Sequence, residues 1–292
     1  MAFTQVSTDG IKNGTITTSD LVTNQDFTIN GITVGKGANS VSGNTVLGEN
    51  ALDAAVTGVN NTAIGKESLS ANTSGNRNTA VGHKALPVNT TGVENTAVGE
   101  AALFNNTTGN YNTAVGRVAL LSNTTGANNS AFGKDALKAN TTGGQNVAIG
   151  YISMDSNTTS SGNVAVGAYT LQAQTDGTGQ NVAVGDSTLY SNTSGAQNTA
   201  VGHRALNANT TSDNNTAIGH DALTSNTTGA QNVAVGSKAL DNNTTGVNNV
   251  AIGFEALDTN TTTDKNIAIG YQSLKTNAAD SNTAVGHQTL RS

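Results

Sequence analysis

The chain has 292 residues and a formal net charge of −6, with 3% aromatic and 11% charged residues and neither cysteine nor tryptophan. Ordinary soluble domains carry about 25% charged residues and fill a compact core with large apolar side chains, so this composition argues against a conventional globular domain. The lack of cysteine excludes disulfides and thiolate metal sites, and the mild acidity argues against a nucleic-acid partner, which needs clustered Lys and Arg.

Residues 1–26 precede the first recognisable pattern and are polar. They have neither the basic region nor the apolar core of a secretory signal. No apolar run in the chain approaches the ~18 residues of a membrane helix. We expect residues 1–26 to be an attachment segment or a tail, followed by an entry or capping coil at 27–43 and a repeat array at 44–292.

A pentapeptide related to Asn-Thr-Ala-Val-Gly recurs through the array in 15 copies with a period of 17 residues. Coil positions are numbered here from its glycine, position 0. Position −4 is always Asn, position −2 is Ala except at Val46, position −1 is always apolar, and position +4 is Leu except at Met154. We expect these positions to form the structural frame, represented by Asn61, Ala63, Ile64, Gly65, Leu69, Asn78, Gly82, Leu86, Asn112, Gly116, Asn198, Gly202, Asn249 and Gly253.

Most coils also contain an Asn-Thr-Thr-Gly or Asn-Thr-Ser-Gly turn that begins at position +7, as at Asn89 and Asn192. The two steps that depart from 17 residues, 18 from Gly167 to Gly185 and 16 from Gly270 to Gly286, change length in this segment. Tolerance of insertions is typical of surface loops. We therefore expect the pentapeptide to be packed and the turn to lie on the surface.

Seventeen residues are too few for a helical hairpin repeat and suit one coil of a β-solenoid. The pentapeptide reads as a short strand, its glycine permits a sharp bend with positive φ, and an Ala-Leu pair at positions +3 and +4 reads as a second wall. The sequence predicts an all-β, parallel β-solenoid, or β-roll, of about 15 coils, about 70 Å long at ~4.8 Å per coil. Asn at position −4 should stack into a ladder of side-chain amides.

Adjacent Ala and aliphatic residues in the pentapeptide should point to opposite faces of the strand, so that both faces are apolar. A strand that is apolar on both faces is usually covered on both. We expect one row to fill the interior and the row of small Ala residues to remain exposed in a single chain. This Ala row predicts a homo-oligomer.

The four histidines, His83, His203, His220 and His287, all occupy position +1. Imidazole is a common metal ligand, but the same position elsewhere holds Glu, Lys, Arg, Tyr or Asp, which is typical of a solvent-facing site. The carboxylates and hydroxyls form no constellation with a histidine. The sequence therefore predicts no catalytic, cofactor-binding or metal-binding residues, no cofactor, and a non-enzymatic protein.

Residues 129–133 (Asn-Ser-Ala-Phe-Gly) and 146–150 (Asn-Val-Ala-Ile-Gly) resemble the coil motif of the trimeric autotransporter adhesin head. That resemblance implies a left-handed parallel β-roll packed as a trimer. The longer unit with Ala-Leu and Asn-Thr-Thr-Gly resembles repeats of phage tail-fibre-type proteins, and residues 2–17 and 27–35 are similar to the N-terminal regions of fibre proteins from cyanobacterial phages. The 17-residue coil and the lack of a heptad stalk favour the fibre over the adhesin.

We therefore expect a structural virion protein, assembled in the host cytoplasm, that forms the shaft of an elongated homotrimeric phage fibre, a tail fibre rather than a capsid fibre. Its partners would be further copies of itself and other virion proteins at the N-terminal end and at the C-terminal end. A host surface receptor would be reached directly or through a partner tip, without nucleic acid or membrane insertion. The alternative is a surface-binding solenoid, either a bacterial adhesin head or an ice-binding protein; ice-binding faces favour Thr-x-Thr on strands, whereas we expect Thr in the turn.

Overall fold

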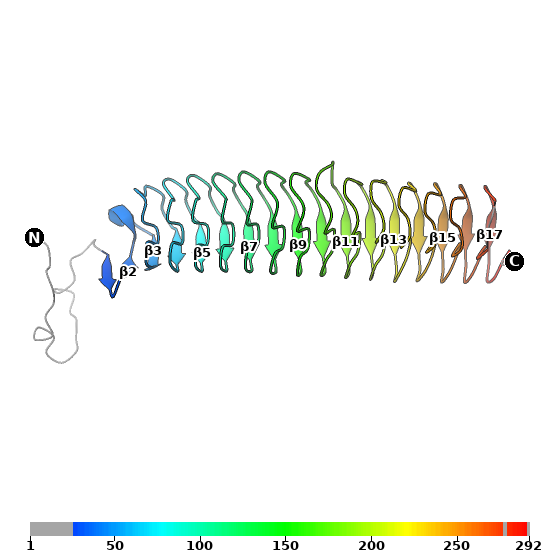
Figure 1. The fold of residues 1–292 in the computed structure, drawn as a ribbon, viewed down its shortest axis with the longest axis horizontal. Coiled ribbons are helices and arrows are strands. Elements are labelled where there is room, and N and C mark those ends of the chain that lie inside the picture. The colour runs from blue at the N-terminus through cyan, green and yellow to red at the C-terminus, as the bar shows by residue number, and fades with distance from the viewer. Residues whose placement is uncertain (1–25, 277–278, 291–292) are drawn as a thin grey trace, which may run out of the picture.

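The computed structural model describes residues 26–276 and 279–290, which form one straight rod of stacked coils (Figure 1). Fifteen short strands, β3 to β17, pair in parallel, and each strand pairs with the next at identical coil positions, as Ala63 does with Ala80. The predicted all-β parallel solenoid with about 17 residues per coil is confirmed. The strands are β1 (Phe27–Ile29), β2 (Ile32–Gly35), β3 (Thr45–Gly48), β4 (Thr62–Ile64), β5 (Thr79–Val81), β6 (Thr96–Val98), β7 (Thr113–Val115), β8 (Ser130–Phe132), β9 (Val147–Ile149), β10 (Val164–Val166), β11 (Val182–Val184), β12 (Thr199–Val201), β13 (Thr216–Ile218), β14 (Val233–Val235), β15 (Val250–Ile252), β16 (Ile267–Ile269) and β17 (Thr283–Val285).

The entry segment is an antiparallel hairpin rather than a coil. Strand β1 pairs with β2, and β2 pairs antiparallel with β3 through Val34 and Leu47. The carboxylate of Asp26 accepts the backbone N–H groups of Lys36 (2.6 Å) and Gly37 (2.7 Å), just before the 3₁₀ turn η2 (Ala38–Ser40). The hairpin therefore covers the edge of β3, which would otherwise present unpaired backbone groups. The attachment segment expected at 1–26 lies outside the described residues except for Asp26.

The interior of the rod is a narrow column of Ala and Leu. Ala63, Leu69 and Leu86 are fully buried, as are most of their equivalents along the array. Each core Leu has a left-handed backbone, with φ of 49° at Leu69 and 51° at Leu86, a conformation that costs roughly 1–2 kcal/mol for a residue with a side chain. Burial of a Leu side chain, about 1.5–3 kcal/mol, offsets this cost, and the Leu69 N–H also donates to the Ala85 carbonyl of the next coil at 3.1 Å.

The expectation that the Ala row at position −2 would be exposed is wrong. These alanines point inward, and the aliphatic row at position −1, which includes Ile64, points outward and is partly or fully exposed. The physical reason is space: the opposite wall supplies Leu at position +4, so the strand can contribute only a methyl group to so narrow a column. Ala recurs there because the interior volume is constant, whereas position −1 accepts Val, Ile, Leu and Phe.

Glycine at position 0 is required by both its conformation and its neighbours. Gly82 has a φ of 136°, and a Cβ built on it would lie 2.6 Å from the Gly99 carbonyl oxygen of the next coil. The equivalent glycines from Gly65 to Gly270 have φ between 125° and 139° and meet the next glycine in the same way. A side chain at this position would separate the coils.

We predict that Gly82→Ala lowers the free energy of unfolding by about 3 kcal/mol, because it combines left-handed strain with a backbone clash. Gly144→Ala is the matched control: it stands at position +11, where other coils hold Val93 and Ala127, its φ is not positive, and an added Cβ would lie 3.0 Å from the Ala127 carbonyl oxygen, compared with 2.6 Å for the Gly82 contact. We expect the control to change stability by less than about 0.5 kcal/mol. Urea unfolding followed by circular dichroism measures both, and equal effects of the two variants would contradict the argument.

Candidate functional site

The Asn residues at position −4 form a buried ladder through the whole array. The side-chain oxygen of Asn61 accepts the backbone N–H of Asn78 at 2.9 Å, and the amide nitrogen of Asn78 donates to the Gly92 carbonyl at 2.8 Å. The pattern repeats from Asn44 to Asn282 and includes Asn112, Asn198 and Asn249. The predicted ladder is confirmed, and its links join side chain to backbone in addition to amide to amide.

A second buried ladder was missed by the sequence analysis. Asn at position +7 was interpreted as the start of a surface turn, but Asn72 and Asn89 are fully buried, and the Asn89 amide nitrogen donates to the Asn72 oxygen at 2.9 Å. The same nitrogen donates to the Gly92 carbonyl of its own turn at 3.0 Å. Only the Thr-Thr part of the turn reaches solvent. Asn at position +7 is nearly constant although the turn that it opens varies in length, and this constancy was the sequence signal of the ladder.

In the 18-residue coil a substitution keeps the ladder's link to the next coil, whereas the link to the coil before is lost and Asn157 Oδ1 is buried without a hydrogen-bond partner. Gln174 stands where most coils hold Asn, and its side-chain oxygen accepts the Asn192 amide nitrogen from the next coil. Its own amide nitrogen donates to the Asp176 carbonyl inside the lengthened turn. The extra methylene of Gln thus lets the ladder residue serve a longer turn without losing contact with the next coil.

We predict that Asn112→Ala lowers the free energy of unfolding by about 2 kcal/mol, because it leaves the buried Asn129 N–H without a partner and removes one of the two Asn donors to the Gly126 carbonyl. Asn105→Ala is the control, since Asn105 is exposed in the neighbouring coil, and we expect a change below about 0.5 kcal/mol. Chemical denaturation measures both. A small effect at Asn112 would mean that the ladder does not stabilise the rod.

The outer face of the parallel sheet is a continuous uncharged surface, which we call the outer stripe. It consists of positions −3 and −1 of every coil, and none of these positions holds a charged residue. Ile149 and Ile218 are each 40% exposed and Val285 is 64% exposed. Large exposed apolar surfaces are rare on monomeric proteins and mark interaction sites. The position −1 row is Leu47, Ile64, Val81, Val98, Val115, Phe132, Ile149, Val166, Val184, Val201, Ile218, Val235, Ile252, Ile269 and Val285.

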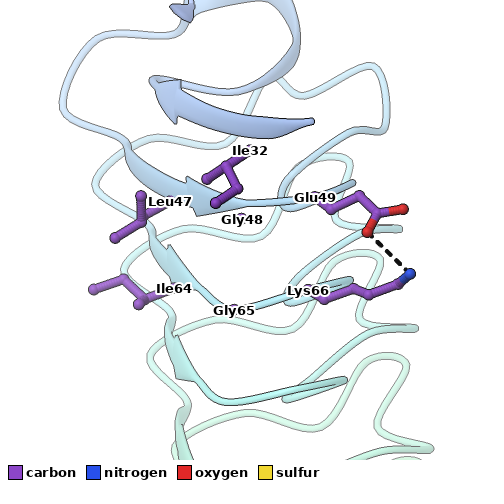
Figure 2. A pocket seen from close by; sticks show the side chains of 7 residues that line it. All are labelled: Ile32, Leu47, Gly48, Glu49, Ile64, Gly65 and Lys66. Atoms are coloured by element: carbon purple, nitrogen blue, oxygen red, sulfur yellow. Dashed lines mark ion pairs between the residues drawn. The ribbon is translucent and has the colours of Figure 1, made fainter. Parts of the chain in front are cut away.

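The entry hairpin extends the outer stripe beyond the first coil. Ile32 on β2 lies beside Leu47 and Ile64, and the three side chains line an open hollow on the same face (Figure 2). The far wall of the hollow is the Glu49–Lys66 ion pair, with Nζ and the carboxylate 3.0 Å apart. The hydrogen bond from Lys66 to Glu49 raises the pKa of Lys66 above its ordinary value. Charged residues thus occur from position +1 onward, at the border of the stripe, and none lies on the stripe itself.

Ion pairs at positions +1 and +2 link adjacent coils along this border. Arg117 pairs with Glu100 and Lys84 with Glu67, at 3.3 and 3.4 Å. Each joins the same position in consecutive coils, and each is exposed enough to contribute little to stability by itself.

The four histidines are exposed at position +1, as expected. The sequence did not reveal that two of them form a stack: the rings of His203 and His220 lie 5.1 Å apart and are inclined by 22°. Asp221 lies beside them, and one ligand atom from each of the three residues falls within 4.8 Å of the others. Among the described residues this is the only group of three His, Cys, Asp or Glu with that proximity.

No protein-family model matches the chain, and no curated protein or solved structure proved similar to it. In the described ranges no helix is long and apolar enough to cross a membrane.

Proposed function

We propose that the chain is a non-enzymatic structural protein that forms the shaft of an elongated homotrimeric fibre of a phage particle, most simply a tail fibre. The observation that carries the proposal is the outer stripe, an uncharged surface, mainly of aliphatic and Thr side chains, that runs the length of a rigid rod. In a single chain the outer stripe is exposed to water. Association of identical chains along this stripe would cover it.

The size of the stripe suits a stable interface. Each coil contributes a strip about 4.8 Å high and about 10 Å wide, so fifteen coils present about 700 Å². A standard protein interface buries about 800 Å² on each partner, and the whole stripe of one chain, shared between its two neighbours in a trimer, approaches that area. Desolvation costs little here, because no charged side chain lies on the stripe.

Cyclic assembly is the arrangement that a fibre needs. Three parallel rods with their stripes turned toward a common axis keep every coil level with its counterparts and bring all the N-terminal ends together. The repeat resemblance to phage fibre proteins and to the trimeric adhesin head supports three copies. The interface differs from the one expected from sequence, since aliphatic side chains rather than alanines would meet at the axis.

We predict that the native chain has three times its 29.2 kDa mass in solution and that Ile149→Asp with Ile218→Asp reduces it to a monomer with an unchanged circular dichroism spectrum. Both residues are 40% exposed in one chain, so Asp should not disturb the interior. Ala127→Asp with Ala230→Asp is the control of equal charge, placed at position +11, where Asp213 and Asp264 occur naturally. The control should remain a trimer. Light scattering after size exclusion measures the mass, and a monomeric native chain would overturn the proposal.

Residues 1–26 are the proposed attachment segment to other virion proteins. We predict that a chain lacking residues 2–25, which keeps the Asp26 contacts of the entry hairpin, still forms trimeric rods but no longer enters particles. Mass spectrometry of purified particles measures incorporation of the full-length and shortened chains side by side. Normal incorporation of the shortened chain would contradict the role in attachment.

A second candidate, ice binding, is favoured by one feature of the outer stripe. In several coils Thr at position −3 precedes an aliphatic residue at position −1 on the strand, as in Thr62–Ile64 and Thr79–Val81, which makes a flat regular array. The array is interrupted at Ser130, from Val147 to Val182 and from Val233 to Ile267. Thermal hysteresis in the monomeric double variant and in the native protein separates the candidates: the fibre proposal expects none in the native assembly.

A further inference from the structure

We infer that His203, His220 and Asp221 form a binding site for a borderline divalent transition-metal cation, of the class of Zn²⁺, Co²⁺ or Ni²⁺. The three side chains come from two adjacent coils, His203 from one and His220 and Asp221 from the next. This inference stands apart from the proposed fibre, because the site needs only one chain. It replaces the expectation of no metal site, which considered each histidine alone.

Stacking of the coils brings the two imidazoles together. Identical coil positions are about 4.8 Å apart along the rod, so histidines at position +1 of consecutive coils must be neighbours. Of the four histidines only these two fall in consecutive coils. His83 and His287 each lie beside coils that carry other residues at this position, and His287 stacks on Tyr271 instead.

The carboxylate is held beside the rings by the backbone. The N–H of Asp221 donates to the carbonyl of His203 at 3.1 Å, which anchors position +2 of one coil to position +1 of the coil before. The Asp221 side chain is only 12% exposed, compared with 47% for His203 and 58% for His220. One wall of the site is therefore fixed. His220 already contacts it, and His203 is more exposed, with its Nε2 3.7 Å from the exposed carboxylate of Asp186.

One oxygen of this carboxylate has no hydrogen bond. Asp221 Oδ2 lies 3.1 Å from His220 Nδ1, but Asp221 Oδ1 is buried without a hydrogen-bond partner, and its nearest cation is Arg204 Nε at 3.5 Å. Arg204 is thus close enough for an ion pair but donates no hydrogen bond to this oxygen, and a buried oxygen without a hydrogen bond is costly. The equivalent carboxylate of Asp135 has a closer cation, since Lys134 Nζ lies 2.6 Å from it.

The ligand types select the metal. Two imidazole nitrogens and one carboxylate oxygen suit Zn²⁺, Co²⁺, Ni²⁺ and Cu²⁺, whereas Mg²⁺ and Ca²⁺ prefer sets of oxygen ligands. Nitrogen and oxygen ligands bind Zn²⁺ at about 2.0–2.2 Å, so ligand atoms now within 4.8 Å of each other need only small rotations of the exposed imidazoles to share one ion. The remaining coordination positions open to solvent. A bound ion would connect two coils just beyond the long coil.

Titration of the full chain with Zn²⁺ alone by isothermal calorimetry tests the inference. We expect one Zn²⁺ per chain, at least tenfold weaker binding for His203→Ala and for His220→Ala, and no effect of His83→Ala or His287→Ala, the matched controls. Excess Mg²⁺ should not compete. The Ile149→Asp, Ile218→Asp variant should bind as tightly as the native chain, which separates this site from the trimer.

Two outcomes would overturn the inference. One is the absence of a stoichiometric Zn²⁺ site in the native chain. The other is binding that His203→Ala and His220→Ala leave unchanged. Because both histidines are exposed, these variants should keep the native circular dichroism spectrum, and Asp221→Asn, which preserves the shape of the buried side chain, gives a second measure through weaker binding.

Discussion

Every feature of this rod depends on the hydrogen bonding that stacks identical positions of successive coils about 4.8 Å apart. At that spacing each side chain meets a copy of itself, or a close relative, above and below. Only residues whose side chains pack or hydrogen-bond favourably against identical side chains can occupy the interior. Ala and Leu pack against their own kind, Asn amides donate to and accept from one another, and glycines let the backbone of one coil approach that of the next.

The two Asn ladders explain how so thin a core is sufficient. A column of Ala and Leu buries little apolar area per residue, and a narrow coil has many backbone groups that bend away from the sheet. The ladders satisfy those groups inside the rod: Asn78 and Asn89 both donate to the same Gly92 carbonyl, one from each side of the turn. Stability is thus a sum of contacts between neighbouring coils, as in other repeat proteins, with no single central core.

The sequence was sufficient to predict the fold, because a strict period of 17 residues with a single glycine frame has few physical solutions. It predicted the position −4 ladder for the same reason. It did not predict which face of the strand points inward. Alternation places Ala63 and Ile64 on opposite faces but does not show which of the two is buried, and a large aliphatic residue is usually the one that is buried. The constancy of Ala at position −2 and the variability of position −1 were the sequence signal that Ala faces the interior. The His203–Asp221 contact depends on the left-handed backbone conformation at position +2, and the residue types found at that position do not predict this conformation.

The replacement of Asn by Gln174 in the long coil shows where this architecture accommodates a change of length. The extra residue in the rim coincides with a substitution at one buried position and the loss of one amide link, whereas the strand, the glycine and the outer stripe of that coil keep their places. Growth of the rim is therefore separable from the surface that we propose for assembly. A longer rim loop changes the surface that the rod presents to solvent, while chains with long and short loops would still present the same stripe to one another.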